Sequence, residues 1–267
     1  MEFSSLLFPV LSLGGLGLVF GVLLGYASKK FEVEVDPLIP LVREALPGAN
    51  CGGCGFAGCD AYAQAVVEKT APANACSVGG ASTALKLGEI LGISVDAQEK
   101  KIAFVKCNGD CASSKNKYNY TEKLDCLEAS RLPGEGAKSC TYGCLGLGSC
   151  VKVCEFGALS VVNGIAVVDE DKCTSCGACV NICPKNLIEI VPESKRVRVS
   201  CNSIDKGKDV RENCSVGCIG CRLCEKNCDY GAVTINDNLA HVDYDKCTLC
   251  GSCVTKCPTK AIKGLIN

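Results

Sequence analysis

The sequence contains one cysteine-rich unit twice, and this duplication constrains the fold more than any other feature. The first copy runs from Cys140 to Cys183 and the second from Cys214 to Cys257, so a shift of 74 residues superimposes eight cysteines without a gap. Other residue types recur at the same shift, for example Gly143/Gly217, Gly157/Gly231, Asp169/Asp243 and Lys172/Lys246. We therefore predict two tandem modules that share one fold and are built around their cysteines.

Both copies contain a run of four closely spaced cysteines followed by a proline. The run C-x2-C-x2-C-x3-C-P consists of Cys173, Cys176, Cys179 and Cys183 with Pro184, and again of Cys247, Cys250, Cys253 and Cys257 with Pro258. In two-cluster ferredoxins, three thiolates of such a run bind one 4Fe-4S cluster and the fourth binds the other cluster. The second copy repeats the run without the proline, as Cys218, Cys221, Cys224 and Cys228. The spacing therefore predicts that each module is a two-cluster ferredoxin-like unit.

Two other uses of cysteine agree less well with this spacing. With 25 cysteines in 267 residues, a disulfide scaffold is the usual expectation for a secreted chain. Disulfides require an oxidising compartment, however, and they do not explain three-cysteine loops repeated in register. Structural zinc uses separated C-x2-C pairs with four ligands per ion, so the third cysteine would have no role. The sequence favours iron–sulfur clusters, with zinc and disulfides as the alternatives.

The repeat predicts how the cysteines are shared among four clusters. In the second module we expect one cluster on Cys218, Cys221, Cys224 and Cys257, and another on Cys247, Cys250, Cys253 and Cys228. The first module departs from this pattern because Leu147 stands where the second has Cys221. Cys140, four residues before Cys144, is the natural substitute. We therefore expect one cluster on Cys140, Cys144, Cys150 and Cys183, and another on Cys173, Cys176, Cys179 and Cys154.

A separate cysteine group lies nearer the N-terminus. Its spacing is C-x2-C-x4-C-x16-C, formed by Cys51, Cys54, Cys59 and Cys76. The glycines among the first three cysteines let the backbone adopt positive φ and approach a cofactor closely. Residues 60–69 place alanine and valine on one face and predict a helix that leaves the loop. We expect a small α-helical 4Fe-4S domain here, with a zinc knuckle as the alternative.

Five cysteines remain once these five clusters have twenty ligands. They are Cys107, Cys111, Cys126, Cys201 and Cys214. A sixth 4Fe-4S cluster is expected on Cys107, Cys111 and Cys126, with Cys140 or one of the two later cysteines as the fourth ligand; buried structural thiols are the alternative. A short phrase, Val105-Lys-Cys-Asn108, recurs as Val199-Ser-Cys-Asn202, and each time a polar loop leads to the next module.

The N-terminal segment predicts a membrane anchor. Residues 3–28 contain no charged side chain and are long enough to cross a bilayer as a helix. A signal peptide would need a basic segment where Glu2 stands, and no convincing cleavage site follows. Lys29 and Lys30 come directly after the span, so the positive-inside rule predicts a single-pass protein of the inner (cytoplasmic) membrane with its C-terminal bulk in the cytoplasm.

These features together predict an α+β chain: one transmembrane helix, a small α-helical 4Fe-4S domain and two tandem two-cluster modules. The expected segments are an anchor (1–30), a linker (31–47), the N-terminal domain (48–82), a connecting segment with extra cysteines (83–139), the first module (140–192), a basic connector (193–213) and the second module (214–267). Residues 158–162 and 165–168 predict a hairpin through Asn163-Gly164, which 233–235 and 239–242 repeat. Residues 187–191 and 196–200 are expected to form a further strand pair.

The order of these elements resembles the B subunit of the Rnf complex, a membrane-bound, ion-translocating ferredoxin:NAD⁺ oxidoreductase. The resemblance rests on the glycine-rich anchor, the C-G-G-C-G-x-x-G-C loop with its distant fourth cysteine, and the ferredoxin modules that follow. The phrases Val105-Lys-Cys-Asn108 and Tyr142-Gly-Cys-Leu-Gly146 are similar to the long form of clostridia-like anaerobes. Shorter relatives carry one module, so the duplication departs from the minimal pattern.

The resemblance implies an electron-transfer role. Reduced ferredoxin would give electrons singly to the clusters, and these would relay them into a membrane complex that reduces NAD⁺ and moves Na⁺ or H⁺ outward. The implied partners are the other membrane and peripheral subunits, soluble ferredoxin and membrane lipid, with no nucleic acid. Flavin and NAD⁺ sites would lie on other subunits, because neither G-x-G-x-x-G nor a P-loop occurs here. The alternatives are a polyferredoxin subunit of a different membrane-bound oxidoreductase and a structural or sensory metal protein.

Two further expectations concern chemistry and docking. With one histidine, no tryptophan and no nucleophile motif, the chain is expected to have no catalytic residue of its own beyond electron transfer. Ferredoxins are typically acidic, so a basic stretch is a candidate docking surface, with a solvated loop as the alternative. It consists of Lys195, Arg196, Arg198, Lys206, Lys208 and Arg211.

Overall fold

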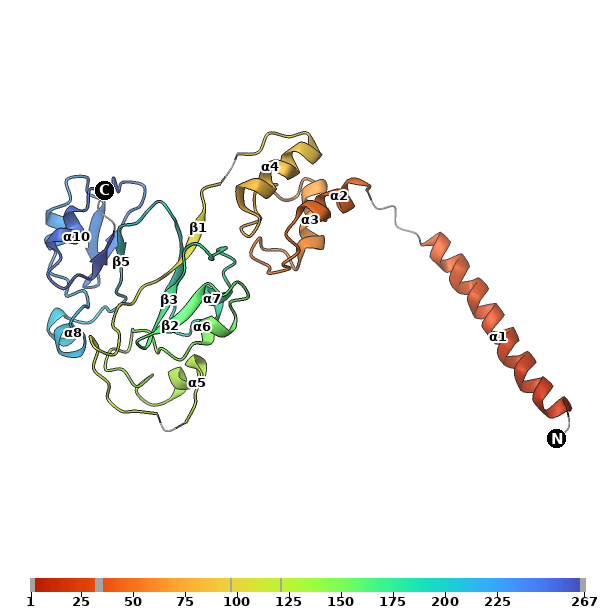
Figure 1. The fold of residues 1–267 in the computed structure, drawn as a ribbon, viewed down its shortest axis with the longest axis horizontal. Helices are drawn as coiled ribbons and strands as arrows, with labels where there is room; N and C mark the ends of the chain where they lie inside the picture. Colours follow the sequence, from red (N-terminus) through yellow and green to blue (C-terminus); the bar gives the residue numbers. More distant parts are fainter. Residues whose placement is uncertain (1–2, 32–35, 97, 121, 265–267) are drawn as a thin grey trace.

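The computed structural model describes residues 3–31, 36–96, 98–120 and 122–264. A long helix, α1 (Phe3–Lys30), projects from a small helical domain, which is followed by two β-containing modules that lie beside each other (Figure 1). The helical domain consists of α2 (Leu38–Ala45), α3 (Cys59–Val67) and α4 (Gly80–Leu91). The first module contains β1 (Lys101–Val105), α5 (Cys126–Arg131), α6 (Ser149–Lys152), β2 (Leu159–Val162), β3 (Ile165–Val168), α7 (Ala178–Ile182) and β4 (Ile188–Pro192). The second contains β5 (Arg198–Val199), α8 (Gly207–Asn213), α9 (Leu223–Lys226), β6 (Val233–Asn236), β7 (Leu239–Val242), α10 (Ser252–Lys256) and β8 (Ile262–Lys263).

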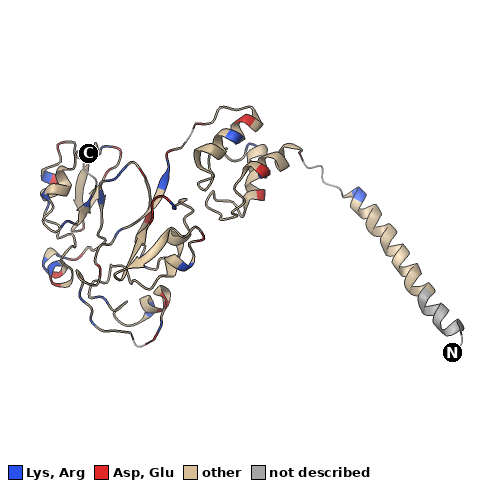
Figure 2. Cartoon of the chain, in the orientation of Figure 1, with Lys and Arg blue, Asp and Glu red and all other residues tan. Residues whose placement is uncertain are grey.

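Helix α1 is long and apolar enough to cross a membrane, judged by length and composition. Its span Leu11–Lys30 has a mean hydropathy of 1.7, and none of it is buried inside the protein. Figure 2 shows no charged side chain along the described part of α1 until Lys29 and Lys30 in its last turn. Of the expected linker (31–47), residues 32–35 lie outside the described residues, and α2 occupies most of the rest.

The N-terminal domain packs three helices around one small core. Val42 of α2, Tyr62 of α3 and Leu87 of α4 are each at most 1 % exposed. The helix expected over residues 60–69 is confirmed as α3. Gly92 has a φ of 66° in the left-handed region, which ends α4 in the way that C-terminal glycines commonly do.

Each module contains one β-hairpin and one further two-stranded sheet. The expected hairpins are confirmed as β2–β3 and β6–β7. In the first, Asn163 and Gly164 have φ values of 48° and 76°, as a type I′ turn requires. In the second module, Asp237 and Asn238 take the same conformation, with φ values of 46° and 62°.

The expected pairing of residues 187–191 with 196–200 is wrong. Strand β4 pairs antiparallel with β1, and β5 pairs antiparallel with β8. Each module therefore closes its second sheet with a strand that precedes its cysteine unit. After β4 the chain turns away, and Arg198 donates hydrogen bonds back to the carbonyls of Pro192 and Glu193, both at 3.3 Å. This fixes β5 as the start of the second module.

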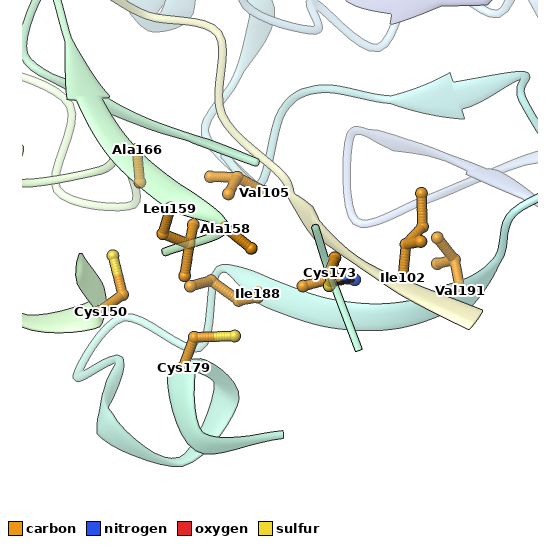
Figure 3. Packing of buried hydrophobic residues seen from close by; sticks show 11 residues of the cluster. Ile102, Val105, Cys150, Ala158, Leu159, Ala166, Cys173, Cys179, Ile188 and Val191 are labelled. Carbon is orange, nitrogen blue, oxygen red and sulfur yellow. Dashed lines mark hydrogen bonds between the residues drawn. The ribbon is translucent and has the colours of Figure 1, made fainter. Parts of the chain in front are cut away.

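The cores of the modules are small, and cysteines form a large part of them. In the first module, the buried cluster combines aliphatic side chains with Cys150, Cys173 and Cys179 (Figure 3). The second core has the same composition, with Cys201, Cys218, Cys224 and Cys253 among its buried members. These seven cysteines thus face the interior of the modules.

Candidate iron–sulfur sites

Four loops of the modules share one backbone shape. The loops run from Cys144 to Cys150, Cys173 to Cys179, Cys218 to Cys224 and Cys247 to Cys253. In each of them, the residues on both sides of the middle position have positive φ. They are Gly146 and Gly148 (73° and 80°), Ser175 and Gly177 (52° and 83°), Gly220 and Arg222 (63° and 60°), and Leu249 and Gly251 (62° and 74°). Turns that alternate in hand curl peptide N–H groups toward one side, where they favour an anionic group. The first loop keeps this shape although Leu147 occupies its middle position.

The loop-173 group consists of Cys173, Cys176, Cys179 and Cys154, which together line one pocket. Backbone N–H groups donate to two of the sulfurs: Ala103 to Cys173 and Ala158 to Cys154, both at 3.3 Å. Burial and the three neighbouring thiols raise the pKa of Cys179 to about 11. These are the four cysteines that the spacing grouped together.

The loop-144 group consists of Cys144, Cys150, Cys183 and Cys126, which line one pocket with apolar neighbours. The sequence had grouped Cys140, and not Cys126, with the other three. Cys126 begins α5, whose N-terminus is fixed by a capping box between Asp125 and Glu128. The Cys126 N–H also donates to Ser149 Oγ at 2.9 Å, which holds α5 against the loop.

The bridging group consists of Cys107, Cys140, Cys201 and Cys214, which line one pocket between the modules. Each module contributes one equivalent pair. Cys107 and Cys201 belong to the repeated Val-x-Cys-Asn phrase, while Cys140 and Cys214 are equivalent positions of the duplicated unit. The environment is also symmetric, because the N–H of Cys144 donates to Cys107 Sγ at 3.3 Å and the N–H of Cys218 is bonded to the Cys201 thiol.

Backbone contacts between the modules hold this cavity in place. The N–H of Lys115 donates to the carbonyl of Asn213 at 3.0 Å, and the N–H of Ser215 donates to the carbonyl of Ser113 at 2.9 Å. Cys201 is buried, and burial raises its pKa to about 11. The pair-by-pair symmetry could have been found from the sequence by combining the two repeats.

The second module contains a loop-218 group (Cys218, Cys221, Cys224 and Cys257) and a loop-247 group (Cys247, Cys250, Cys253 and Cys228). Burial and the thiols of Cys218, Cys221 and Cys257 raise the pKa of Cys224, and burial and the thiols of Cys247, Cys228 and Cys250 raise that of Cys253, in both cases to about 11. The N–H of Ala232 donates to Cys228 Sγ at 3.3 Å, as Ala158 does to Cys154. Cys221 and Cys250 are solvent-exposed, in contrast to their neighbours.

The N-terminal group consists of Cys51, Cys54, Cys59 and Cys76. Burial and then the other three thiols raise the pKa of Cys76, and the N–H of Gly79 donates to its sulfur at 3.4 Å. Tyr62 of α3 holds the returning chain, because its hydroxyl donates to Pro72 O at 2.8 Å and accepts from the N–H of Ala75 at 3.1 Å.

Six groups of four thus include every cysteine except Cys111. Cys111 is exposed and lines none of the three cavities described above. Cys107 and Cys126, which the sequence had grouped with it, line different cavities. Within the described ranges, no three or more His, Cys, Asp or Glu residues form a group that could hold a single metal ion. Cysteines that surround a cavity fit a multi-iron cluster better than one tetrahedral zinc ion.

Sequence comparisons agree with this chemistry. A family model described as "Putative Fe-S cluster" matches residues 46–78, and one described as "4Fe-4S binding domain" matches residues 166–189 and 240–263. The B subunit of the Na⁺-translocating ferredoxin:NAD⁺ oxidoreductase complex of Acetobacterium woodii is 48 % identical over 98 % of this chain and 78 % of the relative. The B subunit of the ion-translocating oxidoreductase complex of Methanosarcina acetivorans is 49 % identical over 97 % and 98 %. The B subunit of the proton-translocating ferredoxin:NAD⁺ oxidoreductase complex of Clostridium ljungdahlii is 46 % identical over 94 % and 90 %.

The chain belongs to the family of Rnf complex B subunits. It is therefore an iron–sulfur electron-transfer subunit of the ion-translocating ferredoxin:NAD⁺ oxidoreductase type. Relatives over nearly the whole chain favour this family over a polyferredoxin of another oxidoreductase. The matched stretches contain the N-terminal group and both proline-terminated cysteine runs.

Proposed function

We propose that the protein is a membrane-anchored electron-transfer subunit that holds six 4Fe-4S clusters in series. It accepts electrons from reduced ferredoxin at the second module and relays them singly through the bridging group and the first module to the N-terminal domain. From there they pass to membrane subunits that reduce NAD⁺ and move Na⁺ or H⁺. The bulk of the chain lies in the cytoplasm, because Lys29 and Lys30 follow the apolar helix.

A linear series of contacts between the six groups carries this proposal. Within the second module, Cys228 and Cys257 each follow one loop and belong to the group of the other, so the two groups adjoin. The Cys218 N–H reaches Cys201 of the bridging group. On the other side, the Cys144 N–H reaches Cys107 of the same group. Each step therefore joins neighbours without a long gap.

The series continues to the anchored end of the chain. Cys179 is one of the thiols that raise the pKa of Cys150 to about 12, after burial, so the loop-144 and loop-173 groups adjoin. Gly53 of the N-terminal loop rests on Cys176, because a Cβ at Gly53 would lie 3.0 Å from the Cys176 carbonyl oxygen and 3.1 Å from its Cα. The absence of a side chain at Gly53 allows this approach.

Solvent exposure supports the second module as the electron-accepting end. Cys221 and Cys250 are exposed, whereas Cys176, the counterpart of Cys250, lies under Gly53. Arg198 of the expected docking stretch is only 5 % exposed and pairs with Glu170 at 2.8 Å, so it is not available to a partner. Lys206, Lys208 and Arg211 remain candidates for steering an acidic ferredoxin. Neutralising these three should raise the KM for ferredoxin at low salt; a KM unaffected by the change at every salt concentration would reject them.

Two experiments test this proposal: the iron and sulfide content of the protein, and electron transfer in a variant without the bridging cluster. Anaerobically purified protein should contain about 24 iron atoms and as many sulfides, against about 20 if only five groups are loaded. The variant Cys201→Ser should remove the bridging cluster. Sub-stoichiometric reduced ferredoxin should then reduce the second-module clusters, while the N-terminal cluster stays oxidised on the timescale of turnover.

The exposed cysteine outside the six groups supplies the matched control. Cys111→Ser should keep about 24 iron atoms and full electron flow to the N-terminal cluster. Reduction of the N-terminal cluster in Cys201→Ser at the unmodified rate would show that electrons bypass the bridging group. Loss of iron from Cys111→Ser would contradict the ligand sets.

A further inference from the structure

Lys138 is a buried lysine at the wall of the bridging cavity. It is 7 % exposed and lines the cavity together with Cys107, Cys140, Cys201 and Cys214. The ammonium donates to the carbonyls of Gly109 at 2.7 Å and Gly164 at 2.9 Å. Gly109 in turn lies against the bridging sulfurs, because a Cβ there would be 3.2 Å from Cys214 Sγ and 3.9 Å from Cys107 Sγ.

Lys138 has no carboxylate partner within ion-pair distance among the described residues. Asp205 lines another part of the cavity, where Ser203 Oγ donates to it at 3.3 Å. Asp110 is partly buried, and its pKa is held low mainly by hydrogen bonds from Ser113, with a smaller contribution from Lys138. Two carbonyl dipoles do not neutralise a full charge, and a buried ion without a counter-charge is strongly unfavourable.

A second, largely buried lysine in the first module has its charge balanced by a carboxylate, as is usual for buried lysines. Lys185 lines the loop-144 cavity, and its side chain is 10 % exposed. Its ammonium forms an ion pair with Glu135 Oε2 at 2.7 Å, so its charge is already balanced within the protein. Lys138 differs because, among the described residues, the dense source of negative charge at its end of the cavity is the set of four cysteine sulfurs.

We propose that Lys138 is a positioning residue whose buried charge is balanced by the thiolate-ligated bridging cluster and raises its reduction potential. This inference rests on the proposed sixth cluster. A cluster becomes one unit more negative when it takes an electron, with no bond made or broken, so a fixed cation nearby favours the reduced state. The bridging group then holds an electron between the modules more readily than it would without Lys138.

The experiment compares charge-removing and charge-keeping variants of the full-length, cluster-loaded protein by EPR-monitored redox titration. The signal of the bridging cluster is identified as the one that Cys201→Ser abolishes. In Lys138→Gln, the reduced-to-oxidised ratio of that cluster at a fixed potential should fall at least tenfold, which is about 59 mV for a one-electron couple. Lys138→Arg should stay near the unmodified potential. The charge of Lys138 also acts on Cys144, so in Lys138→Gln the loop-144 cluster should shift in the same direction by a smaller amount, and the remaining clusters should be unchanged.

Lys117→Gln is the matched control. Lys117 also donates to a backbone carbonyl, that of Gly134 at 2.9 Å, but it is exposed, so its removal should shift no potential. A loaded Lys138→Gln protein with an unchanged bridging potential would overturn the inference and leave Lys138 with a structural role only. If Lys138→Gln fails to load this cluster, loading in Lys138→Arg supports the inference and failure in both overturns it. About 20 iron atoms in the unmodified protein would instead reject the sixth cluster itself.

Discussion

The two modules share one fold but use their equivalent positions differently. The loop-218 group takes its middle cysteine, Cys221, from the loop itself, whereas the loop-144 group has Leu147 there and takes Cys126 from α5. The backbone on both sides of Leu147 and Cys221 is the same, with positive φ at each neighbour. A loop of this shape therefore persists without its cysteine, provided that another segment delivers a sulfur to the same cavity.

The modules also differ in what covers them. Cys176 of the first module lies under Gly53 of the N-terminal domain, while the equivalent Cys250 is exposed. Phe104 and Arg198, which occupy equivalent positions before the repeated Val-x-Cys-Asn phrase, contact each other across the boundary, with the guanidinium 5.4 Å from the ring centroid. The first module is thus enclosed from both sides, and the second faces solvent.

Removal of iron should have the largest effect, because it should unfold both modules and so remove the differences between them. The four sheets among the described residues have two strands each, and isolated two-stranded sheets are marginally stable at best. Metal binding must then supply much of the folding free energy. Anaerobic chelation should remove hydrogen-exchange protection from β1–β8 in both modules. Protection that survives complete iron removal in either module would contradict this.

The first module should accept a middle ligand from its own loop in place of Cys126, as the second module does with Cys221. Cys126→Ala should cost the first module one cluster, or about four iron atoms, as Cys221→Ala should cost the second. Adding Leu147→Cys to Cys126→Ala should restore the iron, because the loop already has the required backbone. Iron and sulfide analysis of these variants and of Cys140→Ala measures this, with Leu147→Cys alone as the control. Full iron content in Cys126→Ala together with loss in Cys140→Ala would favour the grouping that the sequence suggested.

Arg198 should contribute to the boundary by a smaller amount. Its guanidinium donates to Glu170 and to the carbonyls of Lys195, Pro192 and Glu193. Replacement by methionine removes these hydrogen bonds, although the Pro192 carbonyl keeps the one from the N–H of Lys195 at 3.2 Å, and it should destabilise the protein by about 2 kcal/mol. Denaturant unfolding monitored by cluster absorbance would measure it. Arg196→Met, which removes an exposed charge, should change the midpoint little.

The smallest structural change should separate the covered loop from the exposed one. Gly53→Ala places a methyl group against the Cys176 backbone and should slow electron transfer to the N-terminal cluster, with all cluster potentials unchanged. Gly55 has a φ of 87° and open space around it, so Gly55→Asn, a residue that tolerates this conformation, is the control. Rapid-freeze EPR after ferredoxin addition would follow both. Equal rates in the two variants would show that the Gly53 contact is not on the route.

Local features of this protein were predictable, and features that depend on distant segments were not. The hairpin at Asn163-Gly164 follows from two residues, and the loop-173 and loop-247 groupings follow from short spacings. Cys140 and Cys126 are both near the loop-144 group in sequence, and the packing of α5 against Ser149 brings Cys126 to its pocket. Likewise, β4 and β5 are adjacent in the chain, yet each pairs with a strand from much farther away.

The pairwise origin of the bridging group has a consequence for how such a chain arose and matures. One module alone carries only two of the four bridging sulfurs, so a chain with a single module would carry half of this site, which would be complete only when two copies meet. Tandem duplication made that encounter intramolecular and raised the effective concentration of the second half. With the proposed bridging cluster in place, iron insertion at this point would link the two modules to each other, much as a disulfide cross-links two loops.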